Sequence, residues 1–196
     1  MSLWGNSDAD ESKPKNLTTA EKKEVYATAS GWVREAGSAL SGNSNTSADP
    51  EVLVAISALS TNLGAADVTE VEWITTAADK SAGFTLSVRV RYNEAVAVTG
   101  SPTLAVTNGN QGSGSGRGPH SLVYASGTGT NELVFSLAIA AANAATNADD
   151  ILTIGAQNIA KPGGATMKDA TGTASDAAVA ISGAQGTAAG GITVVA

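Results

Sequence analysis

Apolar and polar residues alternate along a series of short segments, which are separated by Gly, Asn, Ser and Thr. In Phe84–Tyr92, for example, leucine and valine alternate with serine and arginine. Such alternation is typical of strands with one buried face. The pattern predicts strands at 68–74, 84–92, 95–98, 103–107, 121–125, 131–139, 150–154, 176–181 and 191–196. Turn residues between these segments favour a β-sandwich over alternating strands and helices.

The first third of the chain has a less regular pattern. Residues 24–29 and 32–34 alternate as strands, with a turn at Ser30-Gly31. Thr18–Glu21 has the spacing of a helix capping box, which predicts at most a short helix before Val25. Residues 51–56 form a continuous apolar run, which is typical of a strand buried on both faces. A neighbouring subunit is one candidate for burying one of these faces. Leu59 and Leu63 leave a helical alternative beyond this run.

The predicted architecture is therefore all-β. An extended N-terminal arm and a small β-rich region occupy residues 1–66, and a β-sandwich occupies residues 67–196. Gly64–Asp67 is the expected boundary between them. Residues 138–145 are alanine-rich and have helical propensity. Because they lie between predicted strands, we interpret them as a strand end followed by a turn.

Composition excludes several classes of protein. The 196 residues carry a net charge of −7, whereas a nucleic-acid binder needs a basic surface, so no nucleic-acid partner is expected. The chain has no cysteine, which excludes disulfides and thiolate metal sites. No apolar run is long enough to span a membrane, and the first residues do not resemble a secretory signal. We therefore expect synthesis in a cytoplasm and no membrane partner.

Few residues suggest chemistry. The one histidine, His120, follows Gly118-Pro119 and is expected in a surface loop. Gly112–Gly116 has the letters of a nucleophile elbow but lies in a low-complexity loop. The acidic residues of the arm (Asp8, Asp10, Glu11) and of the pair Asp149-Asp150 lack the spacing of a calcium loop. The pair is better explained by turn chemistry. We predict no catalytic residue, no metal site and no cofactor.

Other residues suggest contacts rather than catalysis. Arg89 and Arg91 share one face of a predicted strand. This face has three possible roles: it is solvated, it docks an acidic partner, or it pairs with Glu70 and Glu72 on a neighbouring strand. Trp4, near the tip of a polar arm, suggests an anchor, and packing on this chain's own sandwich is the alternative. The candidate partner-binding residues are Leu3, Trp4, Tyr26, Trp32, Val52 and Val54.

Residues 84–182 resemble a bacterial Ig-like repeat of large surface adhesins. The resemblance rests on four runs of sequence. In this pattern an acidic residue and valine precede a Val-Thr-Gly-x-Pro-x-Leu turn and strand. A Gly-rich hairpin then leads into a Leu-x-Phe strand. These runs are Val88–Val106, Tyr124–Phe135, Asp149–Ile154 and Met167–Gly172. The resemblance implies an Ig-like β-sandwich and says little about function.

Residues 1–75 resemble the N-terminal part of small virion structural proteins of tailed, notably marine, bacteriophages. The matching motifs are Met1–Asn6, Lys13–Lys15, Val25–Thr28, Gly31–Val33 and Pro50–Ile56. The resemblance implies a particle component with an Ig-like outer domain. Such domains are thought to reinforce the shell or to bind host surfaces loosely.

These observations lead to one expected function and two alternatives. We expect a non-enzymatic virion protein that decorates or cements the capsid, assembles as a homo-oligomer, and contacts the major capsid protein or other virion proteins. The first alternative is a neck, tail or fibre component. The second is a carbohydrate-binding adhesion module, in which Tyr92 or Tyr124 would contact the glycan on the host surface.

Overall fold

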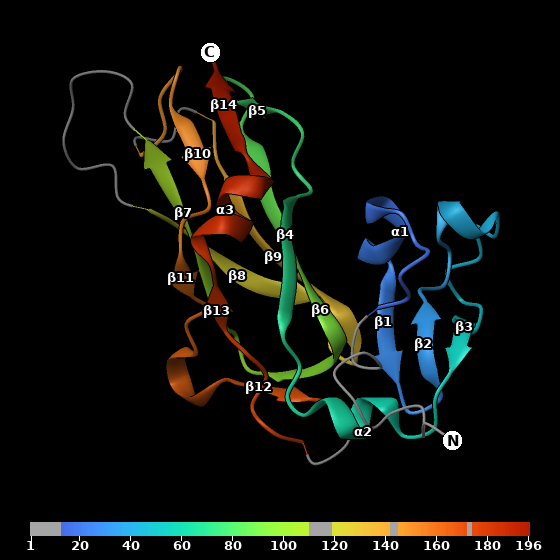
Figure 1. The fold of residues 1–196 in the computed structure, drawn as a ribbon. Coiled ribbons are helices and arrows are strands. Elements are labelled where there is room, and N and C mark those ends of the chain that lie inside the picture. Colours follow the sequence, from blue (N-terminus) through green and yellow to red (C-terminus); the bar gives the residue numbers. More distant parts are fainter. Residues whose placement is uncertain (1–12, 110–118, 142–144, 172–173) are drawn as a thin grey trace.

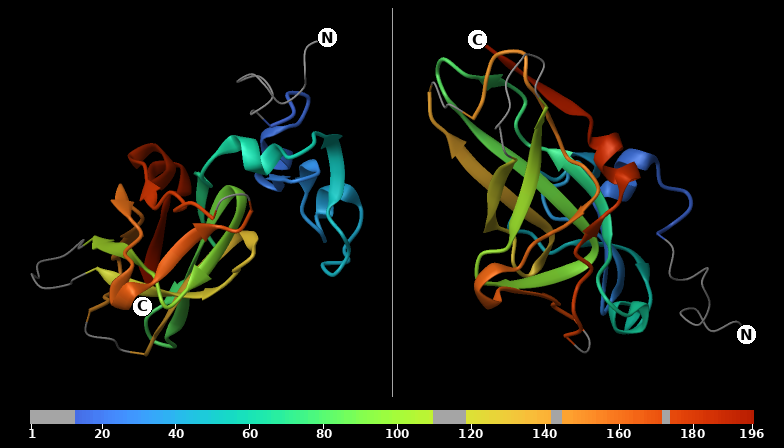
Figure 2. Two further views of the ribbon diagram at one scale, coloured as in Figure 1. Left: turned by 90° about the horizontal axis from the view of Figure 1, so that it is seen from below. Right: turned by 90° about the vertical axis from the view of Figure 1, so that its left-hand side faces the viewer.

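The computed structural model describes residues 13–109, 119–141, 145–171 and 174–196. Strands hold 46% of the residues and helices 14%, so the prediction of a mainly β chain is confirmed. Figure 1 shows a small blue-to-cyan N-terminal part beside a larger set of curved strands. We call residues 13–63 the N-terminal lobe and residues 66–196 the β-body. The lobe stands at one side of the β-body, as the left view of Figure 2 shows most clearly.

The N-terminal lobe is a three-stranded antiparallel sheet with short helices at its ends. Its elements are α1 (Thr19–Lys23), β1 (Val25–Thr28), β2 (Gly31–Arg34), the 3-10 turn η1 (Ala39–Ser41), β3 (Glu51–Ala55) and α2 (Leu59–Leu63). Thr18 and Glu21 form the expected capping box of α1. Val25, Ala27, Trp32, Ile56 and Leu59 form a hydrophobic cluster of their own. The lobe is therefore held by its own small core.

The β-body contains the remaining strands and one further helix. Its elements are β4 (Val68–Trp73), β5 (Ala78–Asp79), β6 (Phe84–Thr99), β7 (Thr103–Gly109), β8 (His120–Ser126), β9 (Thr130–Ile139), β10 (Ile151–Thr153), β11 (Gln157–Asn158), η2 (Pro162–Gly164), β12 (Thr166–Asp169), β13 (Ala180–Ile181), α3 (Gly183–Ala189) and β14 (Gly191–Val195). A 12-stranded sheet has the order β3-β2-β1-β6-β9-β8-β7-β10-β14-β5, with β4 and β12 also on β6. β11 and β13 form a small second sheet.

Strand β6 joins the two parts of the molecule. It pairs with β4, β9 and β12 of the β-body, and Glu94 on it bridges Ala27 of the lobe. Its register on β9 jumps between Arg91 and Val96, so residues 92–95 lie opposite Asn131 alone. Such a bulge bends a strand and redirects side chains. The bend lies where the lobe meets the β-body (Figure 1).

The core of the β-body follows from the alternation in the sequence. Leu86, Val88, Val90 and Tyr92 of β6 all point to one face and are fully buried. They pack with Phe135 of β9 and with the apolar residues of the neighbouring strands in one cluster. Burying these side chains is the main favourable term in the stability of the β-body.

Several elements differ from those that the sequence predicts. Segments 84–92 and 95–98 form the single strand β6 rather than two strands. Only Ala180–Ile181 of segment 176–181 is a strand, apart from the isolated bridge between Asp176 and Lys168. Helix α3 was not predicted. Strand β3 exists, but it lies at the end of the sheet and is not buried on both sides in this chain.

Candidate functional site

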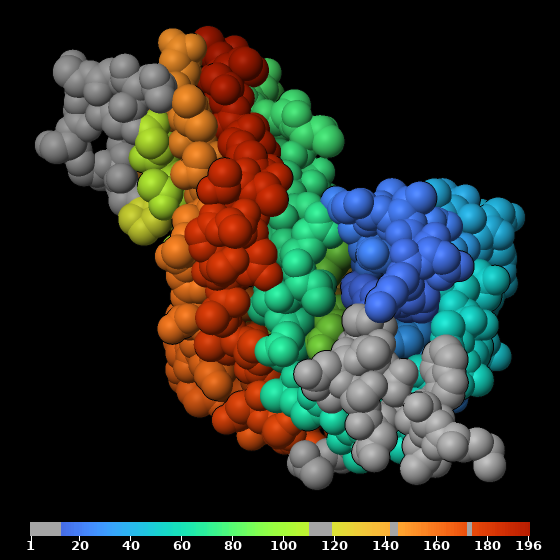
Figure 3. Space-filling model, in the orientation of Figure 1, coloured from blue at the N-terminus to red at the C-terminus, as the bar shows by residue number. Residues whose placement is uncertain are grey.

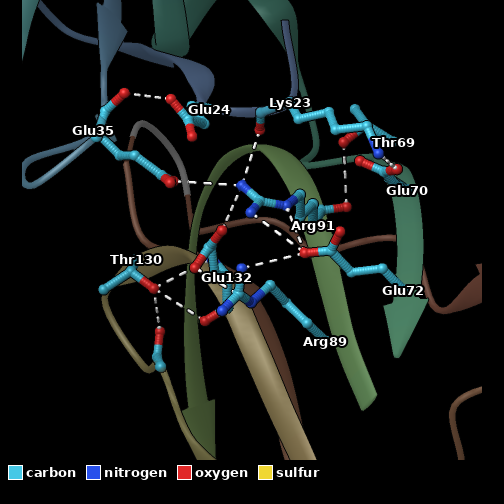
Figure 4. Close-up of polar contacts among 12 residues, drawn as sticks. Lys23, Glu24, Glu35, Thr69, Glu70, Glu72, Arg89, Arg91, Thr130 and Glu132 are labelled. Carbon is cyan, nitrogen blue, oxygen red and sulfur yellow. Dashed lines mark hydrogen bonds and ion pairs between the residues drawn. The ribbon is translucent and has the colours of Figure 1, made fainter. Parts of the chain in front are cut away.

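A cluster of arginines and glutamates lies where the lobe meets the β-body. Its members are Glu35, Glu72, Arg89, Arg91 and Glu132, and we call it the junction cluster. Glu72 is the register partner of Arg89 between β4 and β6, and Arg91 is the partner of Glu132 between β6 and β9. Opposite charges at such cross-strand positions attract. Glu35, which follows β2, brings in a carboxylate from the lobe (Figure 4).

Arg91 is the centre of the junction cluster and is only 5% exposed. Its guanidinium donates to the Lys23 carbonyl at 2.9 Å and lies 3.3 Å from carboxylate oxygens of both Glu35 and Glu72. It also forms an ion pair with Glu132. Arg91 thus connects the lobe to two strands of the β-body. The prediction that this strand face is solvated is wrong for Arg91. The alternative prediction, pairing with Glu72, is confirmed.

The junction cluster contains more carboxylates than guanidinium groups. Glu35, Glu72 and Glu132 surround Arg89 and Arg91, so one negative charge is left without a matching cation. Burial, and next the charge of Glu132, raise the pKa of Glu35 to about 7, although Arg91 acts in the opposite direction. Desolvation and a like charge both disfavour an ionised carboxylate. Glu35 therefore ionises less readily than an isolated, solvent-exposed carboxyl.

A cavity of about 380 Å³ opens beside the junction cluster, and we call it the junction cavity. Its lining comes from the lobe and from β6 and β9, and consists of Tyr26, Glu35, Ala36, Gly37, Thr46, Pro50, Arg89, Thr130, Asn131 and Glu132. Asn131 is 2% exposed, and its Nδ2 atom has no hydrogen-bond acceptor within the part of the chain that the structure describes. Carboxylates, a guanidinium, an amide and a tyrosine ring therefore surround one space.

A second cavity, of about 390 Å³, lies between α1, β4 and α3. Figure 3 shows the hollow between the blue N-terminal residues and the green strand β4. Lys13, Lys22 and Lys23 contribute to its lining. The Nζ atom of Lys13 donates to the Lys22 carbonyl at 2.6 Å. Burial, with the charge of Arg91, lowers the pKa of Lys13 to about 8.

A pair of buried carboxylates lies at the bulge of β6, with Glu94 in the bulge itself and Asp169 at the end of the neighbouring strand β12. Glu94 and Asp169 are 0% and 1% exposed, and the Thr171 hydroxyl is 3.2 Å from Glu94 Oε2 and 2.8 Å from Asp169 Oδ1. One hydroxyl hydrogen cannot serve both carboxylates. Burial, followed by the charge of Asp169, raises the pKa of Glu94 to about 7. A protonated Glu94 satisfies this geometry, because it can donate to Thr171, which in turn donates to Asp169.

The predicted partner-binding residues have different surroundings. Leu3 and Trp4 lie outside the described residues. Tyr26 is half-buried on β1, where it lines the junction cavity. Trp32 is 2% exposed and packs inside the lobe's own cluster, as a core residue of this chain.

The two valines of β3 also differ from each other. Val52 is 52% exposed, whereas Val54 is half-buried and packs against the cluster of the lobe. β3 pairs with β2 on one side, and no strand among the described residues pairs with its other side. Val52 therefore lies on an edge strand that is open to solvent.

The expectation for His120 is wrong. His120 begins β8 and is 6% exposed, and its Nε2 atom lies 3.0 Å from the Thr146 hydroxyl. Burial lowers the pKa of His120, and the charge of Asp150 opposes that shift. Asp150 accepts a hydrogen bond from the Asn147 backbone amide, in agreement with turn chemistry. Gly112–Gly116 and the acidic residues of the arm lie outside the described residues.

Two searches across the described ranges gave negative results. No group of three or more Asp, Glu or His side chains there is arranged to hold a metal ion. No helix within those ranges is both long enough and apolar enough to cross a membrane.

Comparisons with protein-family models, with curated proteins and with solved structures found no match to this chain. Function is therefore inferred from the residues and their arrangement.

Proposed function

We propose that this chain is a non-enzymatic structural protein of a tailed-phage virion, which decorates or cements the capsid. Its N-terminal region contacts the particle, and residues 67–196 form an Ig-like sandwich that faces outward. The sequence resemblances of residues 1–75 and 84–182 support this proposal, as does the high strand content. The charged residues of the junction cluster pair with one another and with the backbone, which favours a role in holding the two parts of the chain together.

The observation that carries the proposal is the open edge of β3. An edge strand offers unpaired amides and carbonyls, to which a strand of a partner can add. Glu51, Val52 and Ala55 of β3 are exposed, and no strand in the described part of the chain pairs along this edge. A second copy of the chain or a capsid protein gains a ladder of backbone hydrogen bonds by pairing here. Many copies on a symmetric shell then bind with high avidity.

A proline on the outer edge of β3 tests this mode of contact. The Ile56 amide donates to Ser30 of the lobe at 3.0 Å, so the alternating Ala55 amide points away from β2. Ala55→Pro removes this outward donor without removing a hydrogen bond to β2. We expect the variant to fold, as circular dichroism can verify, and to lose most of its incorporation into particles. The control is Ala55→Thr, which keeps the amide. Equal incorporation of the two variants would contradict pairing through β3.

Deletion of residues 2–15 tests the anchor. The deletion removes Leu3 and Trp4, and we expect a large loss of occupancy on purified particles, measured by quantitative mass spectrometry. Wild-type occupancy would defeat the anchoring role of the arm. The same measurement gives the copy number, since a high number indicates the head and a low number the neck, tail or a fibre. Absence of the wild-type chain from particles would overturn the proposed function itself.

A further inference from the structure

We propose that the junction cavity binds one sugar unit of a polysaccharide. This inference concerns the chain by itself and does not depend on where the chain is located. The cavity of about 380 Å³ falls in the range of small-molecule sites, which are typically about 300–1,000 Å³.

The lining of the junction cavity matches a ligand that both donates and accepts hydrogen bonds. The side chains of Glu35 and Glu132 offer acceptors, whereas those of Arg89 and Asn131 offer donors. An anion would meet the carboxylates, and a cation would meet the guanidinium of Arg89. A sugar hydroxyl is donor and acceptor at once, so it can be accommodated beside both kinds of group.

Asn131 gives a second, independent indication of a ligand. A buried amide without an acceptor costs free energy, because the hydrogen bond to water is lost and none replaces it. Asn131 is 2% exposed, and its Nδ2 atom lacks an acceptor among the described residues. It lies in the lining of the junction cavity. A ligand hydroxyl that reaches this donor would recover the missing hydrogen bond.

Tyr26 supplies the aromatic surface of the cavity. Val25 and Ala27 of β1 point into the lobe's cluster, so Tyr26 points to the opposite face, where it lines the cavity. An aromatic ring offers an apolar face to the C–H groups of a sugar together with a polar hydroxyl.

The side chains of the other two tyrosines make contacts within the β-body. Tyr92 is fully buried, and its hydroxyl donates to the Ala178 carbonyl at 3.1 Å. Tyr124 packs edge-on against Phe135, with 6.0 Å between the ring centroids, and its hydroxyl accepts from the Thr128 amide. Of the three tyrosines in the chain, Tyr26 is the one that lines the junction cavity.

The test uses the purified full-length chain, labelled with ¹⁵N, and methyl glycosides of glucose, galactose, mannose and N-acetylglucosamine as probes. We expect at least one probe to shift the amide signals of Asn131 and its neighbours. Tyr26→Ala should weaken that binding about tenfold, because the ring contact is lost. Asn131→Ala should weaken it as well. Leu40→Ala, an exposed side chain of the same lobe outside the cavity, serves as the matched control and should bind as wild type.

The alternatives give distinct results. If none of the probes shifts these signals at concentrations of sugar that saturate weak lectins, the proposal is overturned. Binding that survives in both Tyr26→Ala and Asn131→Ala would place the sugar elsewhere and would also overturn it. Methylguanidinium is the probe for a cationic ligand. If it binds at the junction cavity and the sugars do not, the cavity is a site for a basic side chain instead.

Discussion

The Arg91→Met variant is expected to unfold with a free energy about 3–5 kcal/mol below that of the wild type. Arg91 is 5% exposed and compensates carboxylates from β4, β9 and the lobe. Without it, the half-buried carboxylates of Glu35 and Glu132 face each other, and Glu35 loses its ion pair. The loss is a large fraction of the stability of a typical domain, which is about 5–15 kcal/mol. Urea denaturation followed by tryptophan fluorescence measures the change.

Arg89→Met is the matched control for this prediction. Arg89 belongs to the same cluster, but its side chain is 30% exposed and its contacts with Glu72 and Glu132 are 3.1 and 3.5 Å long. Partly solvated ion pairs contribute about 0–1 kcal/mol, so the control should lose far less stability. Adding Glu35→Gln to Arg91→Met should restore part of the loss, because it removes an uncompensated charge. Equal losses for Arg89→Met and Arg91→Met would contradict the central role of Arg91.

Glu94→Gln is expected to raise the free energy of unfolding at pH 8 by about 1–3 kcal/mol and to raise it much less at pH 5. The pKa of Glu94 is about 7 in the folded chain, above the ordinary value of 4.5 for a glutamate. The folded state therefore binds more protons than the unfolded state between these values. The stabilising effect of this protonation is complete below pH 4.5 and is lost as the pH rises through 7. Glutamine mimics the protonated acid at every pH.

The measurement compares the variant with the wild type at a series of pH values from 5 to 8. Taking the difference cancels the other groups that titrate in this range, among them Glu35 and Lys13. Leu40→Ala, at an exposed position and without a titrating group, is the control and should change stability equally at every pH. A stabilisation of the same size at pH 5 and pH 8 would show that Glu94 is not protonated in the folded chain.

The sequence identified the regular strands because their alternation is local. Strands β6, β7, β8 and β9 each have apolar residues at every second position, and this period needs no knowledge of the rest of the fold. The predicted strands at 84–92 and 95–98 left out Asn93-Glu94, but neighbouring strands hold the chain extended through this bulge. A continuous apolar run such as 51–56 does not reveal whether a strand is central or at an edge. Only the pairing partners of β3 decide that.

The candidate site was harder to predict, since it depends on contacts between distant segments. The Arg89-x-Arg91 and Glu70-x-Glu72 spacings allowed one of its pairings to be proposed, because residues two apart share a strand face. Glu35 and Glu132 gave no such signal. They meet only because the lobe covers β6 and β9. Alternation would also have placed His120 on the same face as Leu122, but the preceding Gly-Pro suggested a loop instead.

The attachment of the N-terminal lobe has a mechanical consequence. Among the described residues, Ala27–Glu94 is the register pair that connects β1 to β6, and side-chain contacts such as those of Arg91 add to it. The β-body, in contrast, is cross-linked by the long antiparallel ladder between β6 and β9. Under a pulling force applied at the N-terminus, the lobe should peel away at low load while the β-body stays folded. The released lobe would then act as an extensible tether, which lengthens under a sudden load before the force deforms the β-body.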